Sequence, residues 1–214
     1  MGQNESFDLA GPAGRLEALL MQPEGDAVAA AVLCHAHPLH GGMMHFKVVF
    51  RTAKALQEQG LAVLRFNFRG VGRSEGAHDE GRGEQDDAAT ALNEMERRFP
   101  GRPLVLGGFS FGAAMALLQG ARDPRVRALV ALGFPFRILA DTSFLASLRT
   151  PRLFVQGEND PFGGREAIRE LVEPLPEPKR LVVVADSDHF FTDRLDAVHT
   201  IIGDWAATRP WATG

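Results

Sequence analysis

Short, almost uninterrupted hydrophobic runs alternate with longer amphipathic segments along most of the chain. Runs without polar alternation are typical of strands that are buried on both faces, as in a parallel sheet. The pattern predicts such strands at Ala27–Cys34, Ala62–Phe66, Leu104–Leu106, Arg127–Leu132, Arg152–Gln156 and Arg180–Ala185. Two earlier runs, Ser6–Ala10 and Arg15–Gln22, flank a Gly-Pro-Ala-Gly turn and predict a leading hairpin.

The segments between these runs have the periodicity of amphipathic helices. We predict helices at Met44–Gln59, Arg82–Phe99, Phe111–Ala121, Gly164–Glu173 and Thr192–Ala207. In the second of these, apolar residues recur at steps of three and four, with charged residues between them. Alternation of strands and helices over almost the whole length predicts an α/β fold with a mostly parallel central sheet, formed by a single domain over residues 1–214.

Composition and charge narrow the range of functions. Of the 214 residues, 45% are hydrophobic and 23% are charged, which is typical of a globular domain. The net charge of −4 argues against a nucleic-acid or anionic membrane partner. The N-terminal residues lack the apolar core of a signal peptide, so we expect a cytoplasmic protein, either a monomer or a homodimer. A single cysteine, Cys34, excludes an intramolecular disulfide, and the absence of tyrosine excludes a phenolic acid or base.

The most informative motif is Gly108-Phe109-Ser110-Phe111-Gly112, which lies between a predicted strand and a predicted helix. In that context a G-x-S-x-G sequence is typical of a nucleophile elbow, a sharp turn that projects the serine hydroxyl above the sheet. Glycine on each side lets the strand and the helix approach closely. The N–H groups at the start of the helix then face any oxyanion that forms. We therefore interpret Ser110 as a nucleophile.

Two phosphate-binding interpretations of the glycine-rich segments fail on residue type. The spacing from Gly107 to Gly112 matches a P-loop, but Ala113 and Ala114 stand where Lys and Ser or Thr are required. A dinucleotide motif that begins at Gly70 would have Glu75 at its third glycine position.

A serine hydroxyl becomes a good nucleophile only when a histidine takes its proton. Two histidines follow Ser110 in the sequence, His189 and His199. His189 lies in a loop directly after the last predicted strand, whereas His199 falls inside the last predicted helix. Because catalytic groups gather on loops at strand ends, we favour His189 as the base.

The histidine must in turn be oriented by a carboxylate from another strand end. Asp160, which precedes Pro161 in the polar loop after Arg152–Gln156, is the favoured residue, and Glu158 is the alternative in the same loop. Asp186 and Asp188 are so near His189 in sequence that we expect them to cap or form a turn instead.

The segment from Cys34 to His45 contains four histidines, which raises the possibility of a metal site. The sequence lacks an H-E-x-x-H motif and obvious further ligands, so we expect no metal and no other cofactor. We interpret the segment as the loop that supplies a second oxyanion N–H beside that of Phe111. Pro38 has no N–H, so His37 is the favoured donor and Leu39 the alternative. The imidazoles of His35 and His37 are expected to hydrogen-bond neighbouring backbone.

About eighteen residues, 133–150, separate two of the predicted strands, which leaves room for one short helix but not for a cap domain. An open site favours small, soluble acyl esters. Apolar residues beside the motifs are candidates to line an acyl pocket, although a core position would explain each of them equally well. These candidates are Met43, Phe134, Phe162 and Phe190.

Taken together, these motifs resemble the α/β-hydrolase superfamily, and most of all its small, lidless bacterial serine hydrolases in the dienelactone-hydrolase-like esterase group. The resemblance spans roughly residues 5–208 and is carried by the segments 35–42, 66–76, 108–112, 157–160 and 188–189. It implies an α/β-hydrolase fold without a cap domain, with Ser110 as nucleophile, His189 as base and Asp160 as orienting acid. The sequence departs from the family's frequent His-Pro-His-Pro pattern at Ala36.

The resemblance implies hydrolysis of a small-molecule carboxylic ester through an acyl-enzyme on Ser110. A dienelactone hydrolase proper has a cysteine nucleophile, so the serine argues against that narrow activity. A thioesterase, an amidase or a peptidase would use the same triad. A non-catalytic ligand receptor on the same fold and a metalloenzyme built on the His35–His45 cluster are the alternatives from other classes.

Overall fold

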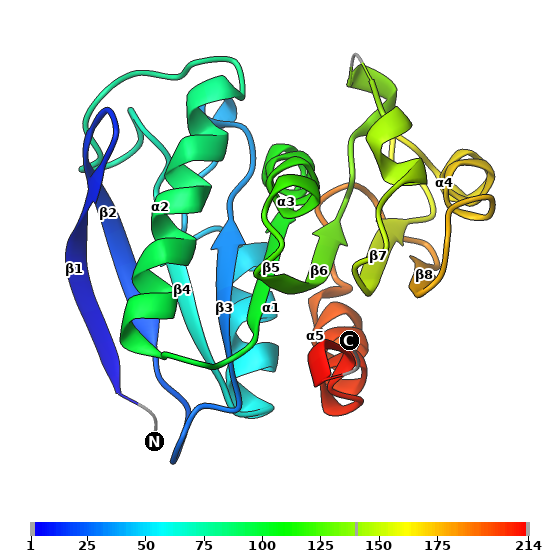
Figure 1. Cartoon of the computed structure of the whole chain (residues 1–214). Helices are drawn as coiled ribbons and strands as arrows, with labels where there is room; N and C mark the ends of the chain where they lie inside the picture. The colour runs from blue at the N-terminus through cyan, green and yellow to red at the C-terminus, as the bar shows by residue number, and fades with distance from the viewer. Residues whose placement is uncertain (1–2, 140, 213–214) are drawn as a thin grey trace.

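The computed structural model describes residues 3–139 and 141–212. The hydrophobic runs form an eight-stranded sheet in the order β1-β2-β4-β3-β5-β6-β7-β8 (Figure 1). The hairpin strands β1 and β2 are antiparallel to each other, and β2 is antiparallel to β4, whereas the strands from β4 to β8 pair in parallel. The strands are β1 (Asn4–Gly11), β2 (Gly14–Met21), β3 (Ala29–Cys34), β4 (Leu61–Phe66), β5 (Leu104–Phe109), β6 (Val126–Leu132), β7 (Arg152–Gly157) and β8 (Lys179–Val184).

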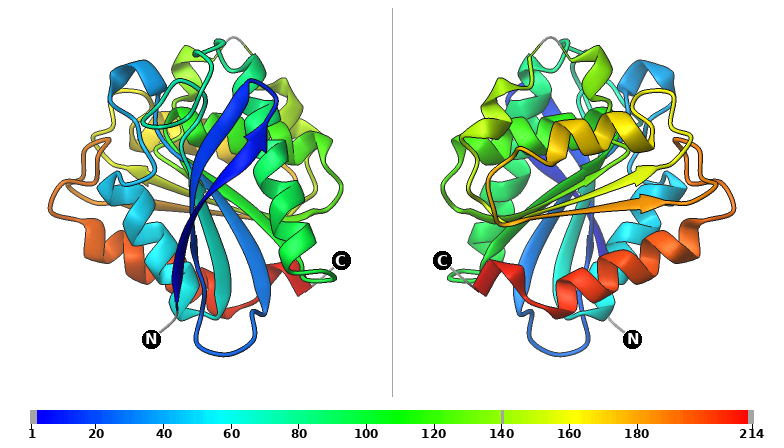
Figure 2. Two further views of the ribbon diagram at one scale, coloured as in Figure 1. Left: turned by 90° about the vertical axis from the view of Figure 1, so that its left-hand side faces the viewer. Right: turned by 90° about the vertical axis from the view of Figure 1, so that its right-hand side faces the viewer.

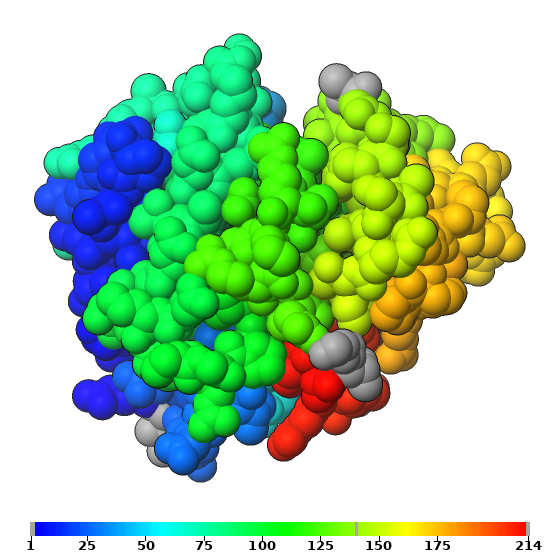
Figure 3. Space-filling model, in the orientation of Figure 1, coloured from blue at the N-terminus to red at the C-terminus, as the bar shows by residue number. Residues whose placement is uncertain are grey.

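Helices cover both faces of this sheet (Figure 2). Helices α1 and α5 pack on one face, and α2, α3 and α4 pack on the other. In the space-filling view the side chains of α2 and α3 close over the second face (Figure 3). The helices are α1 (Lys47–Glu58), α2 (Arg82–Arg98), α3 (Phe111–Arg122), α4 (Arg165–Val172) and α5 (Leu195–Ala207).

The continuous apolar runs are explained by burial on both faces. Every residue of β3, β4, β5 and β7 is buried. Alternate residues of β5 enter different cores: Leu104 and Leu106 pack with α2 and α3, whereas Val105 and Phe109 pack with α1 and α5. The predicted mostly parallel sheet with flanking helices is therefore confirmed.

The structure differs from the sequence-based expectation at three elements. Strand β8 pairs only with β7, so most of its residues stay partly exposed instead of being buried on both faces. Helix α1 begins at Lys47 rather than Met44, because the preceding residue, Phe46, has ψ +138°, which is outside the helical range. Helix α5 begins at Leu195 rather than Thr192, because Asp193 has a positive φ of +55°, which a right-handed helix does not contain.

The connection between β6 and β7 is short, as expected, but it does not contain the single helix that its length allowed. Its described residues, 133–139 and 141–150, form two short 3₁₀ turns at Phe136–Ile138 and Ser143–Ala146 and no cap domain. In the part of the chain that the structure describes, no helix is long and apolar enough to cross a membrane.

Candidate active site

Ser110 occupies the sharp turn between β5 and α3. Its backbone has φ +56° and ψ −121°, a left-handed conformation that costs a non-glycine residue about 1–3 kcal/mol. Three hydrogen bonds hold this conformation. The Ser110 N–H donates to the Leu132 carbonyl at 2.9 Å, and its own carbonyl accepts from the N–H groups of Ala113 and Ala114 at 2.8 and 3.2 Å. The turn is thus held in the strained geometry that an elbow requires.

The glycines of the motif are required by close backbone approach. A methyl group on Gly108 would lie 2.3 Å from the carbonyl oxygen of Gly112, which is far inside van der Waals contact. Gly112 packs in the same way against the carbonyl groups of Cys34 and His35 at the end of β3. These contacts bring the loop after β3 next to the start of α3, and hence next to Ser110.

A continuous chain of hydrogen bonds joins three of the residues singled out from the sequence. Ser110 Oγ lies 2.9 Å from His189 Nε2, and His189 Nδ1 lies 2.7 Å from Asp160 Oδ2. A carboxylate has no proton to donate, so Nδ1 carries the proton and Nε2 accepts one from the serine hydroxyl. His189 and Asp160 are buried, and Ser110 is half-buried. The arrangement can take a proton from Ser110 and return it to a leaving group.

The loops that carry Asp160 and His189 are tied together by Glu158. Its Oε2 accepts the Asp186 N–H at 2.8 Å, and its Oε1 accepts from Arg165 Nε at 2.7 Å. These bonds, led by the one from Asp186, lower the pKa of Glu158. The structure therefore brings Asp160 to His189 and uses the alternative carboxylate, Glu158, to hold the neighbouring loop.

Gln156 also contacts the site, and the sequence analysis did not single it out. Its Nε2 donates to Asp160 Oδ2 at 2.8 Å, and its Oε1 accepts the Phe134 N–H at 2.9 Å. The Phe162 N–H donates to the other oxygen of Asp160, also at 2.8 Å. The sequence signal that could have revealed Gln156 is a glutamine at the end of a run that the pattern predicts to be a buried strand, because a buried amide needs hydrogen-bond partners.

The side chains of the other two candidates, His199 and Asp188, form hydrogen bonds with residues outside the triad. His199, on α5, pairs with Glu58 of α1, with Nε2 and Oε2 separated by 2.9 Å. Asp188 accepts from the N–H groups of Phe190 and Thr192 at 3.0 and 2.9 Å. Asp188 therefore forms the turn that was expected, and these bonds, led by the one from Thr192, lower its pKa.

The candidate oxyanion donors are the N–H groups of Phe111 and of the loop after β3. Phe111 is the first residue of α3, where a helix leaves its N–H groups without internal partners. The Leu39 N–H donates to His37 Nδ1 at 3.2 Å, which occupies the alternative donor. Within residues 3–139 and 141–212, no hydrogen bond engages the backbone N–H of His37. This pattern favours His37 over Leu39 as the second donor.

The histidines after β3 separate into different environments. His35 is fully buried, its Nδ1 lies 2.6 Å from the Ala36 carbonyl, and its Nε2 accepts the Phe68 N–H at 3.0 Å. Burial lowers the pKa of His35 to about 4, so the ring is neutral near pH 7. The expectation that His35 and His37 bond to neighbouring backbone is confirmed. Among the described residues, no three His, Cys, Asp or Glu side chains are grouped as a metal site.

Two of the four candidate pocket residues, Phe162 and Phe190, contact the ring of His189, and a third, Met43, lines a groove together with Phe190. The rings of Phe162 and Phe190 lie with their centroids 4.8 and 5.2 Å from the His189 ring. The groove that Phe190 and Met43 line is open and has a volume of about 920 Å³. The expectation for Phe134 is wrong, because this side chain is fully buried in the core, where it contacts other phenylalanine rings and leaves no surface for a ligand.

Comparison with known proteins is consistent with this geometry. A family model described as an alpha/beta hydrolase domain matches residues 27–207. An uncharacterized protein of Rickettsia prowazekii is 34% identical over 207 residues, which cover 92% of this chain and 87% of that protein. An alpha-beta serine hydrolase homologue from Coxiella burnetii has a TM-score of 0.87 at 35% identity, over 94% of this chain and 96% of that chain. A serine hydrolase without lid from Xanthomonas campestris has a TM-score of 0.86 at 34% identity, over 98% of this chain and 95% of that chain.

Proposed function

The chain belongs to the α/β-hydrolase family, and from that premise we propose that it is a serine hydrolase that cleaves small carboxylic esters. The observation that carries the proposal is the hydrogen-bond chain from Ser110 through His189 to Asp160, with distances of 2.9 and 2.7 Å. The short connection between β6 and β7 leaves this site without a cap domain, which supports small substrates that enter directly from solvent.

The reaction has two stages. Ser110 Oγ attacks the ester carbonyl carbon while its proton passes to His189 Nε2, and the N–H groups of Phe111 and His37 bind the oxyanion. The C–O bond to the alcohol then breaks, and the alcohol leaves with the proton from His189. A water molecule next gives a proton to His189 and attacks the acyl-enzyme. The acid is released and the proton returns to Ser110.

Asp160 stabilises the imidazolium that forms in each stage and keeps the His189 ring in the required tautomer. The rings of Phe162 and Phe190 beside His189 are apolar and favour alkyl or aryl parts of the substrate. No cofactor takes part in these steps. The cytoplasmic location and the monomeric or homodimeric state expected from the sequence belong to the same proposal, and cell fractionation and analytical ultracentrifugation test them.

Labelling with a fluorophosphonate and ester hydrolysis by Ser110→Ala test the proposal. We expect stoichiometric labelling of the wild-type protein, no labelling of Ser110→Ala, and a fall in kcat of about 10⁴–10⁶-fold. Ser147→Ala, at an exposed position after β6, is the matched control and should be labelled and active.

Wild-type ester hydrolysis by Ser110→Ala would rule out the proposed nucleophile. An unlabelled wild-type protein would indicate a non-catalytic ligand receptor, and loss of activity with a chelator would indicate a metalloenzyme. Turnover of matched ester, thioester and anilide substrates separates an esterase from a thioesterase, an amidase or a peptidase that uses the same triad.

A further inference from the structure

An open groove lies between the loop after β3 and the loop after β8, beside the proposed triad. Its volume of about 920 Å³ is within the size range of small-molecule sites. One wall comes from the loop after β3 and the start of α1, and it includes Met43 and Phe46. The other wall comes from the loop after His189 and the start of α5, and it includes Phe190 and Leu195. Both walls therefore offer apolar side chains to a ligand.

The groove is continuous with the triad through the ring of Phe190. The centroid of this ring lies 5.2 Å from that of His189 and 6.0 Å from that of Phe46. The Phe46 ring in turn stacks on Phe109, the residue before Ser110, at 5.5 Å. Phe190 is still 53% exposed, so these contacts leave about half of its side chain open. A molecule bound against Phe190 is therefore one ring away from His189.

The turn that carries Phe190 is held by Asp188. The Phe190 N–H donates to Asp188 Oδ1 at 3.0 Å, and the Thr192 hydroxyl donates to Asp188 Oδ2 at 2.8 Å. A ligand that contacts the Phe190 ring consequently meets a surface that is already ordered, and binding does not have to offset the entropy of fixing this loop.

The charged side chains of the two walls balance one another. Lys47 and Arg51 line the groove together with Asp193 and Asp196, and Arg51 forms an ion pair with Asp196. The formal charges of these four residues cancel, so the groove selects neither an anion nor a cation by net charge. Its apolar side chains favour a neutral group.

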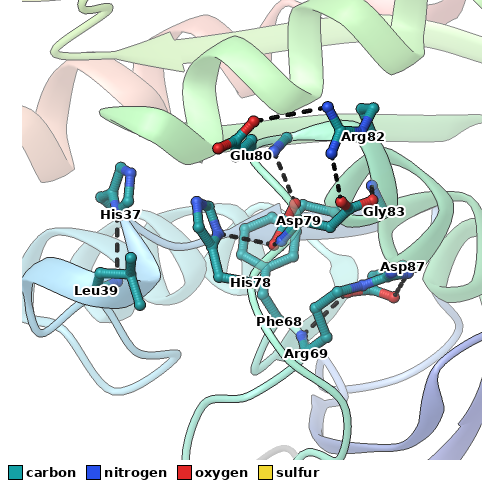
Figure 4. Close-up of polar contacts among 12 residues, drawn as sticks. His37, Leu39, Phe68, Arg69, His78, Asp79, Glu80, Arg82, Gly83 and Asp87 are labelled. Atoms are coloured by element: carbon teal, nitrogen blue, oxygen red, sulfur yellow. Dashed lines mark hydrogen bonds and ion pairs between the residues drawn. The ribbon is translucent and has the colours of Figure 1, made fainter.

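Past Phe111, the site is bordered by side chains that contact one another. The Phe111 ring lies 5.0 and 5.7 Å from the rings of His37 and His78, and these two histidine rings are 4.8 Å apart (Figure 4). The loop that carries His78 is anchored by the ion pair of Arg69 with Asp87, at 2.8 Å (Figure 4). An extended part of the substrate is therefore better accommodated in the groove beside Phe190 than on this side.

The proposed reaction decides which part of an ester reaches the groove. The leaving oxygen takes its proton from His189 Nε2, so it must lie beside His189. The carbonyl oxygen must face the N–H of Phe111. Because the Phe190 ring contacts the His189 ring, the alcohol part, which is bonded to the leaving oxygen, is the part that extends over Phe190.

We propose that the groove is the subsite for the alcohol part of the substrate, with Phe190 and Met43 as specificity-determining residues. The substrate class is then esters of neutral alcohols that carry an aryl ring, in preference to methyl esters that carry the same ring on the acid. An aryl ring against Phe190 buries apolar surface and gains an aromatic contact. This inference rests on the proposed esterase function and adds the side of the ester that is recognised.

The test uses two isomeric esters, benzyl acetate and methyl phenylacetate, which carry the same ring on opposite sides of the ester bond. Hydrolysis is followed by proton release, with methyl acetate as the common reference. For the wild-type enzyme we expect kcat/KM for benzyl acetate to exceed that for methyl phenylacetate by about tenfold. In Phe190→Ala this ratio should fall toward one. Met43→Ala, which truncates the opposite wall, should lower the ratio as well.

Phe50→Ala is the matched control, because Phe50 is 43% exposed, as Met43 is, but lines a different hollow, next to Met21. Its ratio should equal that of the wild-type enzyme, and thermal unfolding checks that each variant is folded. A wild-type ratio near or below one overturns the inference. So does a Phe190→Ala protein in which kcat/KM falls by the same factor for all three esters, because Phe190 would then act only through His189. Loss of the ratio in Phe50→Ala overturns it too.

Failure of the proposed function is distinguishable from failure of this inference. If no ester is hydrolysed and fluorophosphonate does not label Ser110, the esterase proposal fails. A methyl NMR titration of Ser110→Ala with benzyl acetate then tests the groove directly, since this variant should not consume the ester. A saturable shift of the Met43 methyl resonance, identified by its absence in Met43→Ala, supports the site. A Met43 resonance that does not respond to benzyl acetate overturns it.

Discussion

A methyl group added to Gly112 would lie 2.3 Å from the carbonyl oxygen of Cys34. The first turn of α3 and the end of β3 are therefore in direct backbone contact. This contact sets the distance between Phe111, which follows Ser110, and the loop that contains His37. Both candidate oxyanion donors depend on a position where only glycine fits.

Gly112→Ala should consequently lower activity without touching the triad. We expect kcat to fall by about 100-fold, because a displacement on the order of 1 Å between the two oxyanion donors is enough to cost that factor. The measurement is ester hydrolysis at saturating substrate. Gly203→Ala, in α5, is the control, because its nearest neighbour outside the helix is a flexible Gln59 nitrogen at 3.8 Å. That variant should keep full activity, and wild-type activity in Gly112→Ala would contradict the prediction.

Replacement of the two carboxylates in the loop after β7 should have very different effects. Asp160→Asn removes the acceptor that fixes the His189 tautomer, and kcat should fall by about 10⁴-fold. Glu158→Gln removes an ion pair with Arg165 at the surface, so kcat should change by less than about tenfold. Steady-state kinetics on one ester, with thermal unfolding of both variants, makes the comparison. Equal losses in the two variants would mean that Asp160 acts only through the loop.

Gln156→Leu should reduce stability as well as activity. The change leaves the buried N–H of Phe134 without its acceptor and removes one donor from Asp160. A buried polar group that loses its partner costs about 1–3 kcal/mol, which urea unfolding can measure. Gln119→Leu, on a half-exposed face of α3, is the matched control and should stay within about 0.5 kcal/mol of wild type. A Gln156→Leu protein as stable as the wild type would show that Gln156 is dispensable.

His35 should make folding stability depend on pH. Burial lowers its pKa in the folded protein from 6.5 to about 4, so the unfolded chain binds the proton more tightly than the folded protein does. The free energy of unfolding is therefore unaffected by the titration of His35 above about pH 6.5. It falls progressively as the pH is lowered toward 4, by about 3 kcal/mol in all. Urea unfolding at pH 7 and pH 5 measures the slope. His35→Gln should flatten it, and an unchanged slope would assign the dependence to other groups.

Much of the fold follows from local pattern. The uninterrupted apolar runs predict the strands because a strand between two helical layers has no solvent-facing side, and β5 shows this on both of its faces. The pattern wrongly predicts that β8 is buried on both faces. β8 is the last strand of the sheet, and the order of strands depends on contacts between residues that are distant in sequence. The predicted helix starts at Met44 and Thr192 were three residues too early, because Phe46 and Asp193 have non-helical backbone angles that the apolar periodicity does not reveal.

The candidate site divides in a similar way. The sequence alone predicted the parallel sheet and the Gly108–Gly112 turn, selected Ser110 and His189, and favoured Asp160 over Glu158, because each of these depends on residue type and order along the chain. Only the tertiary structure decided that Asp160 rather than Glu158 contacts His189, that Phe134 lies in the core, and that Gln156 donates a hydrogen bond to Asp160. Hydrogen bonding and burial depend on which atoms the fold brings within about 3 Å of one another. The order of residues along the chain does not determine these distances.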